Sequence, residues 1–288
     1  MHRHRLAACA AALTGTLVGT LIGCSSGGAG QPVPVAATAS PSQEVLVDRD
    51  DALAKALTPL LPDGDARVAV AVAALDGTAD SAVYDGASAY DTASVVKVDI
   101  LAALLLRAQG AGRVLTSRER AYATAMIENS DNASATALWD VIGGADGLDA
   151  ANETLGLTGT TAGEGGRWGL TRTTAADQLT LLRAVFGPTD DAVLSEASRT
   201  YIRQLMGNTA ADQRWGVSAA ASGDGCALKN GWLPRSATGL WDINSVGRVT
   251  VGGKRYLVAV LSDGNATKEA GVALVEEVAK AAVAVLTG

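Results

Sequence analysis

Histidine is almost absent from this sequence of 288 residues, since its two histidines, His2 and His4, stand at the very beginning. They lie in a segment of the kind that is removed on export, so the mature protein is predicted to contain none. Catalysis by a Ser-His-Asp or Cys-His arrangement is then excluded, and so is a histidine metal site. Nucleophilic catalysis in this chain would need another base, and lysine is the candidate.

Cysteine is also scarce, with three in the chain. Cys9 belongs to the same leader and Cys24 follows it, which leaves Cys226 as the cysteine of the folded part. An internal disulfide is therefore excluded. We expect Cys226 to be buried as a small apolar side chain, and we expect neither a metal nor a cofactor.

Basic residues are in the minority, with 23 Lys and Arg against 30 Asp and Glu and a formal net charge of −7. This balance argues against a nucleic-acid partner. After the leader and a linker, about 245 residues are left, enough for one large domain or two interleaved small ones. We expect a monomer.

The N-terminal segment is typical of an exported lipoprotein. Residues 1–23 have a basic opening and an apolar run too short to span a bilayer, which predicts a signal peptide. The ending before Cys24 resembles a bacterial lipobox, although an ordinary signal peptide would leave this cysteine incidental. Residues 24–42 are rich in Ser, Gly, Pro and Ala, which predicts a flexible tether before a domain over 43–288. We expect a lipid anchor at the outer face of the cytoplasmic membrane.

The order of apolar and turn patterns predicts an α/β protein. Strands are expected near both ends of the domain, so both chain ends should build one sheet, with a helical block between them. The helix that begins at Ser94 is apolar on nearly every face, which is typical of an interior helix. Helices are expected over 43–61, 94–110, 117–128, 133–142, 145–155, 173–186, 195–206 and 266–286, and strands over 68–75, up to 84–86, and over 224–230, 239–251 and 254–262.

Ser94 and Lys97 stand one helical turn apart at the start of that interior helix. The ammonium would reach the hydroxyl, and burial would favour the neutral amine that a general base requires. Asp91 or Thr92 is expected to cap the helix, whose first N–H groups favour negative charge beside Ser94. About 0.35 Ser-x-x-Lys matches are expected by chance, so this pair needs support from elsewhere.

Two further motifs support the pair of Ser94 and Lys97. Ser130-Asp131-Asn132, for which about 0.03 chance matches are expected, falls in a loop between two expected helices, where Ser130 or Asn132 can also cap the second helix. Lys229-Asn230-Gly231 lies on an expected strand and is followed by Trp232. Gly231 would let a substrate backbone approach the strand edge.

In this order, the three motifs resemble the S-x-x-K, S-D-N and K-T-G set of class A β-lactamases and penicillin-binding proteins. The resemblance extends over 132–144, 173–183 and 256–260. It implies a β-lactamase/transpeptidase-like fold, an α+β sandwich with an antiparallel sheet from both chain ends and an all-helical block.

The resemblance also implies a role for each motif residue. Ser94 is the acylated nucleophile and Lys97 takes its proton. Ser130 passes a proton to the departing nitrogen, and Lys229 orients it and attracts the substrate carboxylate. Asn132 binds the substrate's side-chain amide.

Further substrate contacts are implied around the third motif. The oxyanion hole would be the backbone N–H groups of Ser94 and Trp232. Gly231 and Asn230 complete the substrate-binding set, with Asn230 in place of the usual Thr or Ser hydroxyl. Arg235 is a further candidate for the substrate carboxylate. Trp168, Trp215, Trp232 and Trp241 could line the cleft or pack in the core.

Two departures from the family pattern concern the walls of the site. The interval between Ser94 and Ser130 is short, so the site should be more open on that side. The loop 156–171 lacks the E-x-x-L-N setting of the class A glutamate that activates water for deacylation, and Glu164 is its single glutamate. Glu164 is a candidate base, or an exposed charge paired with Arg167.

The sequence therefore predicts a β-lactamase-like serine hydrolase that acylates readily and deacylates slowly. Its substrate would be a β-lactam or a small molecule derived from peptidoglycan. Two alternatives stay open: a D-alanyl-D-alanine peptidase, which uses the same motifs, and a non-catalytic lipoprotein that binds cell-wall peptide.

Overall fold

The computed structural model describes residues 49–61, 64–76, 80–188, 192–223 and 225–288. The predicted signal peptide 1–23, the tether 24–42 and Cys24 lie outside the described residues. Among the described helices, none has the length and apolar character needed to cross a membrane.

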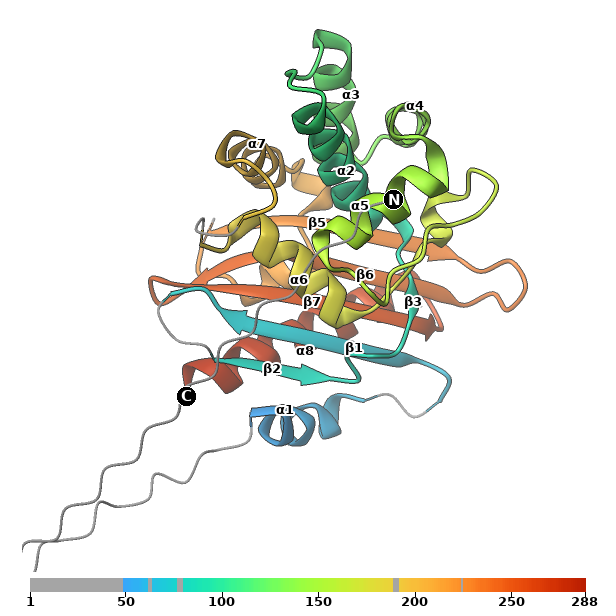
Figure 1. Ribbon diagram of the computed structural model, residues 1–288. Helices are drawn as coiled ribbons and strands as arrows, with labels where there is room; N and C mark the ends of the chain where they lie inside the picture. The colour runs from blue at the N-terminus through green and yellow to red at the C-terminus, as the bar shows by residue number, and fades with distance from the viewer. Residues whose placement is uncertain (1–48, 62–63, 77–79, 189–191, 224) are drawn as a thin grey trace, which may run out of the picture. The chain divides into compact units, whose positions relative to one another are not determined.

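A five-stranded antiparallel sheet forms the centre of the domain, with strand order β2-β1-β7-β6-β5 (Figure 1). Its register joins the two ends of the chain, because Val70 of β1 pairs with Val260 of β7. This confirms the predicted sheet from both chain ends. The strands are β1 (Arg67–Ala74), β2 (Ser81–Tyr84), β5 (Cys226–Pro234), β6 (Trp241–Val251) and β7 (Lys254–Asn265).

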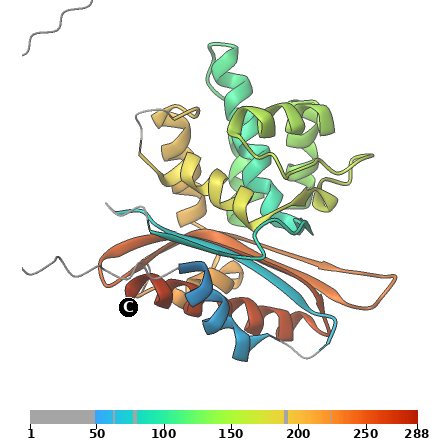
Figure 2. The ribbon, with the colours of Figure 1, turned by 60° about the horizontal axis from the view of Figure 1, so that its bottom comes forward.

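Helices cover both faces of this sheet (Figure 2). The helical block on one face contains α2 (Val96–Gly110), α3 (Ser117–Glu128), α4 (Asn132–Ile142), α5 (Gly144–Leu155), α6 (Ala175–Phe186) and α7 (Glu196–Gly207). The other face carries α1 (Arg49–Leu57) and α8 (Lys268–Thr287). The sequence predicted each of these helices, with α1 shorter than expected within the described residues and followed by the 3₁₀ turn η1 (Thr58–Leu60).

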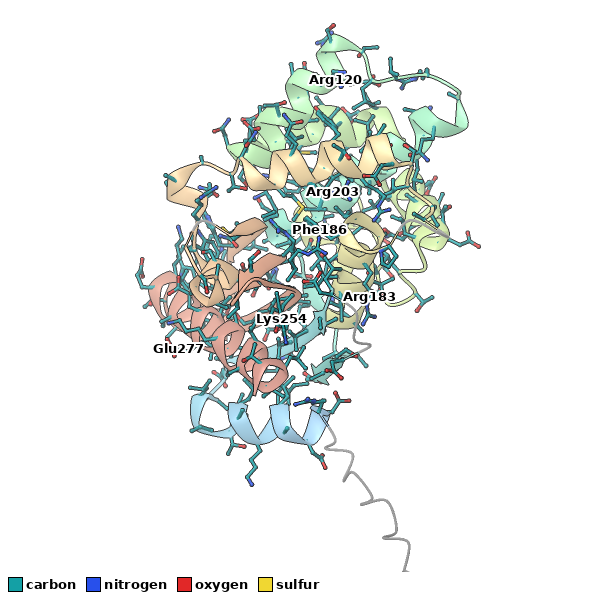
Figure 3. All side chains as sticks on the ribbon, turned by 90° about the vertical axis from the view of Figure 1, so that its left-hand side faces the viewer. Arg120, Arg183, Phe186, Arg203, Lys254 and Glu277 are labelled. Atoms are coloured by element: carbon teal, nitrogen blue, oxygen red, sulfur yellow. The ribbon has the colours of Figure 1, made fainter. Side chains whose placement is uncertain are left out.

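Two apolar cores follow from the alternation of side chains along the strands. Ala69 and Ala71 of β1 face the helical block, whereas Val70 and Val72 face α8. Phe186 belongs to the first core, and Figure 3 shows it in the layer between the helices and the sheet. Cys226 is free and buried, as expected.

Two short strands were not predicted. β3 (Tyr90–Asp91) and β4 (Arg172–Thr173) pair antiparallel, outside the main sheet. Each is two residues long, which is too short for a periodic pattern. They join the chain just before Ser94 to the chain just after the loop 156–171.

Candidate active site

Ser94 lies in a short 3₁₀ turn, η2 (Ala93–Val95), directly before α2, rather than in the first turn of α2 itself. The expected capping of this segment is wrong, because Thr92 makes no side-chain cap and Asp91 forms ion pairs instead. Ala93 has a φ of 47°, a left-handed conformation that costs a non-glycine residue free energy. The backbone is therefore strained immediately before the candidate nucleophile.

Asn244 of β6 fixes this strained segment. Its buried Nδ2 donates to the backbone oxygens of Asp91 at 2.8 Å and Thr92 at 3.0 Å, and its Oδ1 accepts from the Ser262 backbone at 3.1 Å. These bonds tie the turn that carries Ser94 to the central sheet. Asn244 was not predicted from the sequence, although a polar residue within an apolar strand is an indication of a structural or functional role.

Gly231 brings the edge strand β5 against the same turn. A Cβ atom added to Gly231 would lie 2.7 Å from the backbone nitrogen of Ser94 and 2.8 Å from the backbone oxygen of Thr92. Real Cβ atoms do not make contacts this short. A glycine is therefore required here for η2 and β5 to approach each other.

Lys97 is fully buried, and its ammonium turns toward the loop between α3 and α4. Its Nζ donates to the Ser130 backbone oxygen at 2.6 Å, to Ser130 Oγ at 3.0 Å and to Asn132 Oδ1 at 2.8 Å. Burial lowers the pKa of Lys97 to about 8, against a smaller opposite effect of Asp131. An amine with this pKa is neutral in a useful fraction at mildly alkaline pH.

Lys229 approaches the same hydroxyl from the sheet side. Its Nζ donates to Ser130 Oγ at 2.9 Å and to the Asn230 backbone oxygen at 2.8 Å. Burial holds the pKa of Lys229 well below its ordinary value, and the charge of Lys97 adds to this effect. Two lysines, one from α2 and one from β5, therefore converge on one serine.

The loop that carries Ser130 has its own local construction. Ser130 adopts a φ of 56°, and Asp131 caps α4 by accepting from the Ser134 backbone at 2.6 Å. The cap is thus Asp131, whereas the sequence favoured Ser130 or Asn132. Because Asp131 is the cap, Ser130 Oγ and Asn132 Oδ1 are available to accept hydrogen bonds from Lys97 Nζ.

The amide of Asn230 does not occupy the place expected for it. Its Nδ2 donates to the backbone oxygens of Gln213 at 2.7 Å and Trp215 at 3.0 Å, and its Oδ1 accepts from Ser245 Oγ at 2.6 Å. Because side chains alternate along a strand, Asn230 points to the opposite face from Lys229 and Gly231. The expected contact with a substrate carboxylate is therefore wrong for this side chain, which fixes the 213–215 segment instead.

Trp232 lies on the same face as Asn230 and is 43% exposed. Its ring is 6.0 Å from that of Trp241, and Lys268 Nζ lies 4.4 Å from its centroid. Arg235 is also engaged, since its Nη1 lies 2.6 Å from Asp91 Oδ2. It is therefore not a free cation for a substrate carboxylate.

The loop 156–171 presents an aromatic residue, not a carboxylate, to Lys97. Glu164 is exposed, and only its backbone oxygen has a hydrogen-bond partner, Arg167. The Trp168 ring lies 5.0 Å from Lys97 Nζ, and its Nε1 donates to Thr136 Oγ1 of α4 at 3.2 Å. The Trp168 side chain therefore packs against Lys97, whereas the Trp232 ring packs with Trp241 and Lys268.

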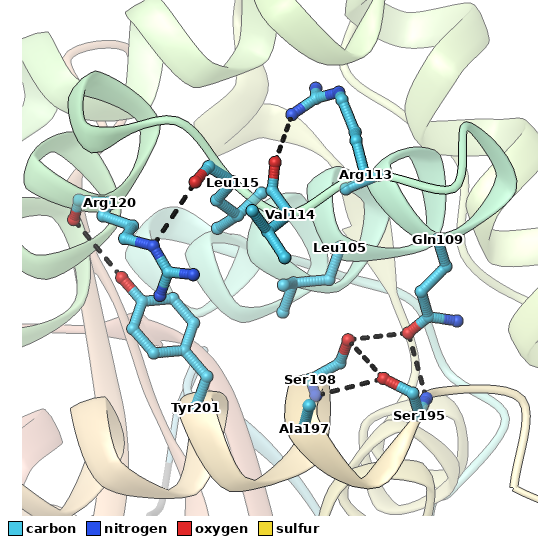
Figure 4. Close-up of a pocket in the computed structure, with 11 residues that line it drawn as sticks. Leu105, Gln109, Arg113, Val114, Leu115, Arg120, Ser195, Ala197, Ser198 and Tyr201 are labelled. Atoms are coloured by element: carbon cyan, nitrogen blue, oxygen red, sulfur yellow. Dashed lines mark hydrogen bonds between the residues drawn. The ribbon is translucent and has the colours of Figure 1, made fainter.

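A separate apolar cavity of about 140 Å³ lies between α2, α3 and α7 (Figure 4). Its lining includes Leu105 and Gln109 from the second half of α2, whereas Ser94 precedes the first turn of that helix. At 1.5 Å per residue, about 20 Å separates Ser94 from Gln109. This cavity is not part of the site around Ser130.

The fold is that of class A β-lactamases and related penicillin-binding proteins, as solved structures show. A class A β-lactamase from Bacteroides cellulosilyticus matches with a TM-score of 0.70 and 19% identity, covering 83% of this chain and 98% of that one. PBP-A matches with a TM-score of 0.70 and 18% identity, over 82% of this chain and 96% of that one. A PBP-A mutant, solved as an acyl-enzyme complex with penicillin G, gives 0.68 and 19% over the same shares.

The family follows from the sequence comparison. The model of the β-lactamase enzyme family matches residues 116–286. A comparison with curated proteins gives no match. The chain belongs to the β-lactamase enzyme family.

Proposed function

We propose that this protein forms an acyl-enzyme through Ser94, with Lys97 as the base. The observation that carries the proposal is the convergence of Lys97 Nζ at 3.0 Å and Lys229 Nζ at 2.9 Å on Ser130 Oγ. A serine hydroxyl has two acceptor sites and one proton. Because two lysines fill the acceptor sites, the proton of Ser130 is left to donate elsewhere, as proton delivery to a leaving nitrogen requires.

The proposed acylation moves one proton from Ser94 to the leaving nitrogen. Neutral Lys97 takes the Ser94 proton as Oγ attacks the amide carbonyl, and the backbone N–H groups of Ser94 and Trp232 hold the oxyanion. The carbon–nitrogen bond then breaks while Ser130 gives its proton to the nitrogen. Lys97 restores the proton of Ser130 through their hydrogen bond. Asn132, bonded to Lys97 through Oδ1, keeps its Nδ2 for the substrate's acyl side chain.

Deacylation is proposed to be slow. Hydrolysis of the ester needs a base beside a water molecule. Glu164 is exposed and forms no hydrogen bond or ion pair with Lys97 or Ser130, whereas the Trp168 ring lies 5.0 Å from Lys97 Nζ. This arrangement excludes water where a base would have to hold it.

The same tryptophan favours a second candidate within the family, a D-alanyl-D-alanine peptidase. Such an enzyme forms the same acyl-enzyme and need not hydrolyse a β-lactam ester quickly. The acyl-enzyme of PBP-A with penicillin G supports penicillin as a reagent for either candidate. We also propose that Cys24 carries a lipid that keeps the domain near the cell wall, on the pattern of residues 1–24.

Intact-mass spectrometry after incubation with benzylpenicillin tests the proposal. A stable adduct that is absent from Ser94→Ala supports acylation with slow turnover. No adduct together with rapid loss of the drug would indicate an efficient β-lactamase. No adduct and no loss would favour the non-catalytic cell-wall binder.

Glu164→Gln separates the two enzymatic outcomes. We expect this variant to match the unmodified protein in adduct formation and in hydrolysis of a chromogenic cephalosporin, because the carboxylate is exposed and forms no hydrogen bond or ion pair with a site residue. Rapid cephalosporin hydrolysis that is abolished in Glu164→Gln would overturn the proposal of slow deacylation.

A further inference from the structure

A polar cavity of about 210 Å³ lies beside the candidate active site, at the turn that connects β5 to β6. Its charged lining comes from six segments of the chain, the first of which is Asp65, just before β1. Arg172 comes from β4, Asp91 from β3, Asp242 from β6 and Asp263 from β7, and Arg235 follows β5.

The strand register places this cavity relative to Ser94. Gly231, which touches the Ser94 backbone, pairs with Asn244, and the pair Leu233–Asp242 follows two residues further along. Positions two apart on a strand share one face and lie about 7 Å apart. Asp242 therefore stands on the same face as Gly231, about 7 Å along the sheet.

Most of the charges in the cavity are paired with each other. Asp91 accepts on Oδ1 from Arg172 Nη1 at 3.3 Å, and its Oδ2 forms an ion pair with Arg235 Nη1 at 2.6 Å. Asp263 is held by the Arg67 guanidinium, with Nε donating to Oδ1 at 3.0 Å. Arg172 and Arg235 are therefore both paired with Asp91, and Arg67 is paired with Asp263.

Asp242 is paired less closely, through an ion pair with Arg235 but no hydrogen bond to Oδ2. It is 3% exposed, and its Oδ2 has no hydrogen-bond partner. The nearest cationic atom, Arg235 Nη1, lies 3.5 Å away and is engaged with Asp91. A buried carboxylate oxygen without a donor is costly, and Asp242 lines the cavity, so a ligand that brings a donor would satisfy it.

We propose that this cavity is a subsite for a protonated amine at the far end of the substrate's acyl side chain, with Asp242 Oδ2 as its acceptor. The inference rests on the proposed acylation at Ser94. Carboxylates outnumber arginines in the lining, which disfavours an anion. Within the described residues, no group of three or more His, Cys, Asp or Glu is arranged to hold a metal ion, and an ammonium would supply the donor that Asp242 Oδ2 lacks.

The protonation of Asp242 adds a pH signature. Burial raises the pKa of Asp242 to about 6, with Arg235 and Arg172 opposing the shift and Asp91 and Asp263 adding to it. The carboxylate is therefore ionised at neutral pH and increasingly protonated below about 6. Preference for an amine should fall as the pH falls through this value.

A matched pair of penicillins tests the proposal, one with a pentanoyl and one with a 5-aminopentanoyl side chain. The ratio of their second-order acylation rate constants, amine over neutral, is measured by intact mass. Asp242→Asn should lower this ratio about tenfold, as for the loss of one charged hydrogen bond. Arg235→Gln, which removes the competing cation, should raise it.

The control is Asp76→Asn, the same change at a carboxylate that binds Arg255 near the other end of β7. It should leave the ratio unchanged. A ratio that stays constant in both Asp242→Asn and Arg235→Gln would overturn the proposal. A purely structural role for the two residues would not move the ratio in opposite directions.

A binding measurement separates this inference from the proposed acylation. In Ser94→Ala, saturation-transfer NMR should detect 5-aminopentanamide but not pentanamide, and Asp242→Asn in that background should abolish the signal. If penicillins fail to acylate the protein while the amine binds, the proposed function fails and the subsite stands. Equal signals from the two amides would overturn the subsite.

Discussion

The ammonium of Lys97 lies 5.0 Å from the centroid of the Trp168 ring, and a hydrogen bond to Thr136 holds that ring against α4. An aromatic face so close to a cation stabilises the charged form of the lysine. The same ring also displaces water from the ammonium, and this loss of hydration disfavours the charged form. The pKa of Lys97 is lowered to about 8, with burial as the largest cause, so the exclusion of water dominates.

Replacement of Trp168 tests whether the ring protects the acyl-enzyme. Trp168→Ala opens one face of Lys97 to water, and we expect the half-life of the penicillin adduct to fall about tenfold, which corresponds to about 1.4 kcal/mol in the barrier. Trp168→Phe keeps an apolar ring and should retain most of the lifetime. Time-resolved intact mass gives both half-lives, and equal lifetimes for the unmodified protein and Trp168→Ala would contradict this role.

The pH dependence of acylation should report Lys97. A lysine base must be neutral, so the second-order acylation rate constant should rise about tenfold per pH unit below about 8 and level off above it. Lys97→Met should abolish the reaction, whereas Lys280→Met, a change at an exposed lysine of α8, should not alter the profile. A rate constant that is flat between about pH 6 and 9 would exclude Lys97 as the base.

Gly231→Ala should slow acylation because it displaces the backbone around Ser94, although it removes no reacting group. The added Cβ would stand 2.7 Å from the Ser94 nitrogen, so η2 or β5 must shift, and a displacement of about 1 Å costs about 10² in rate. Gly207→Ala is the matched control, since nothing lies within 4 Å of its added Cβ. Stopped-flow acylation compares the two variants, and a fast Gly231→Ala enzyme would refute the close approach.

Asp99 should make folding stability depend on pH. It is fully buried in α2, with Oδ1 accepting from Gln178 Nε2 at 3.3 Å and Oδ2 without a partner. Burial raises the pKa of Asp99 to about 7, above an unfolded value of about 3.9. The protonated form therefore contributes stability that is complete below about pH 4 and is lost as the pH rises to about 7, by up to about 1.4 kcal/mol per pH unit.

Asp99→Asn should remove this contribution to the pH dependence of the free energy of unfolding. Urea unfolding at several pH values between about 5 and 8 gives the free energy of unfolding of both proteins. We expect the difference between them to change in favour of Asp99→Asn as the pH rises. Parallel curves would show that Asp99 does not titrate in this range.

The sequence predicted the fold well because its elements are long and strongly patterned. The interior helix and the three C-terminal strands carry clear apolar signals, and the structure confirms the antiparallel sheet from both chain ends. The structure joins Lys97, Ser130 and Lys229 by hydrogen bonds and sets Gly231 against the backbone of Ser94, while the roles of these residues stay predictions.

The features that the sequence did not predict depend on the direction of single side chains and on contacts between segments that are far apart in the chain. Asn230 was placed by its position in a motif, yet the two-residue period of a strand already put it on the other face from Lys229. Trp168 and Asn244 act across the fold, on Lys97 and on the turn before Ser94, and no local pattern indicates which distant segment a side chain will meet.

The contacts of β5 and β6 with the turn that carries Ser94 have a consequence for the synthesis and folding of the protein. The nucleophile turn is fastened by Asn244 of β6 and flanked by Gly231 of β5, both of which are synthesised long after Ser94. Contacts between such distant segments form late and slowly in folding. A chain that stops before β5 would therefore carry its serine without the neighbours that make it reactive, and the protein should gain its chemistry only when its synthesis is nearly complete.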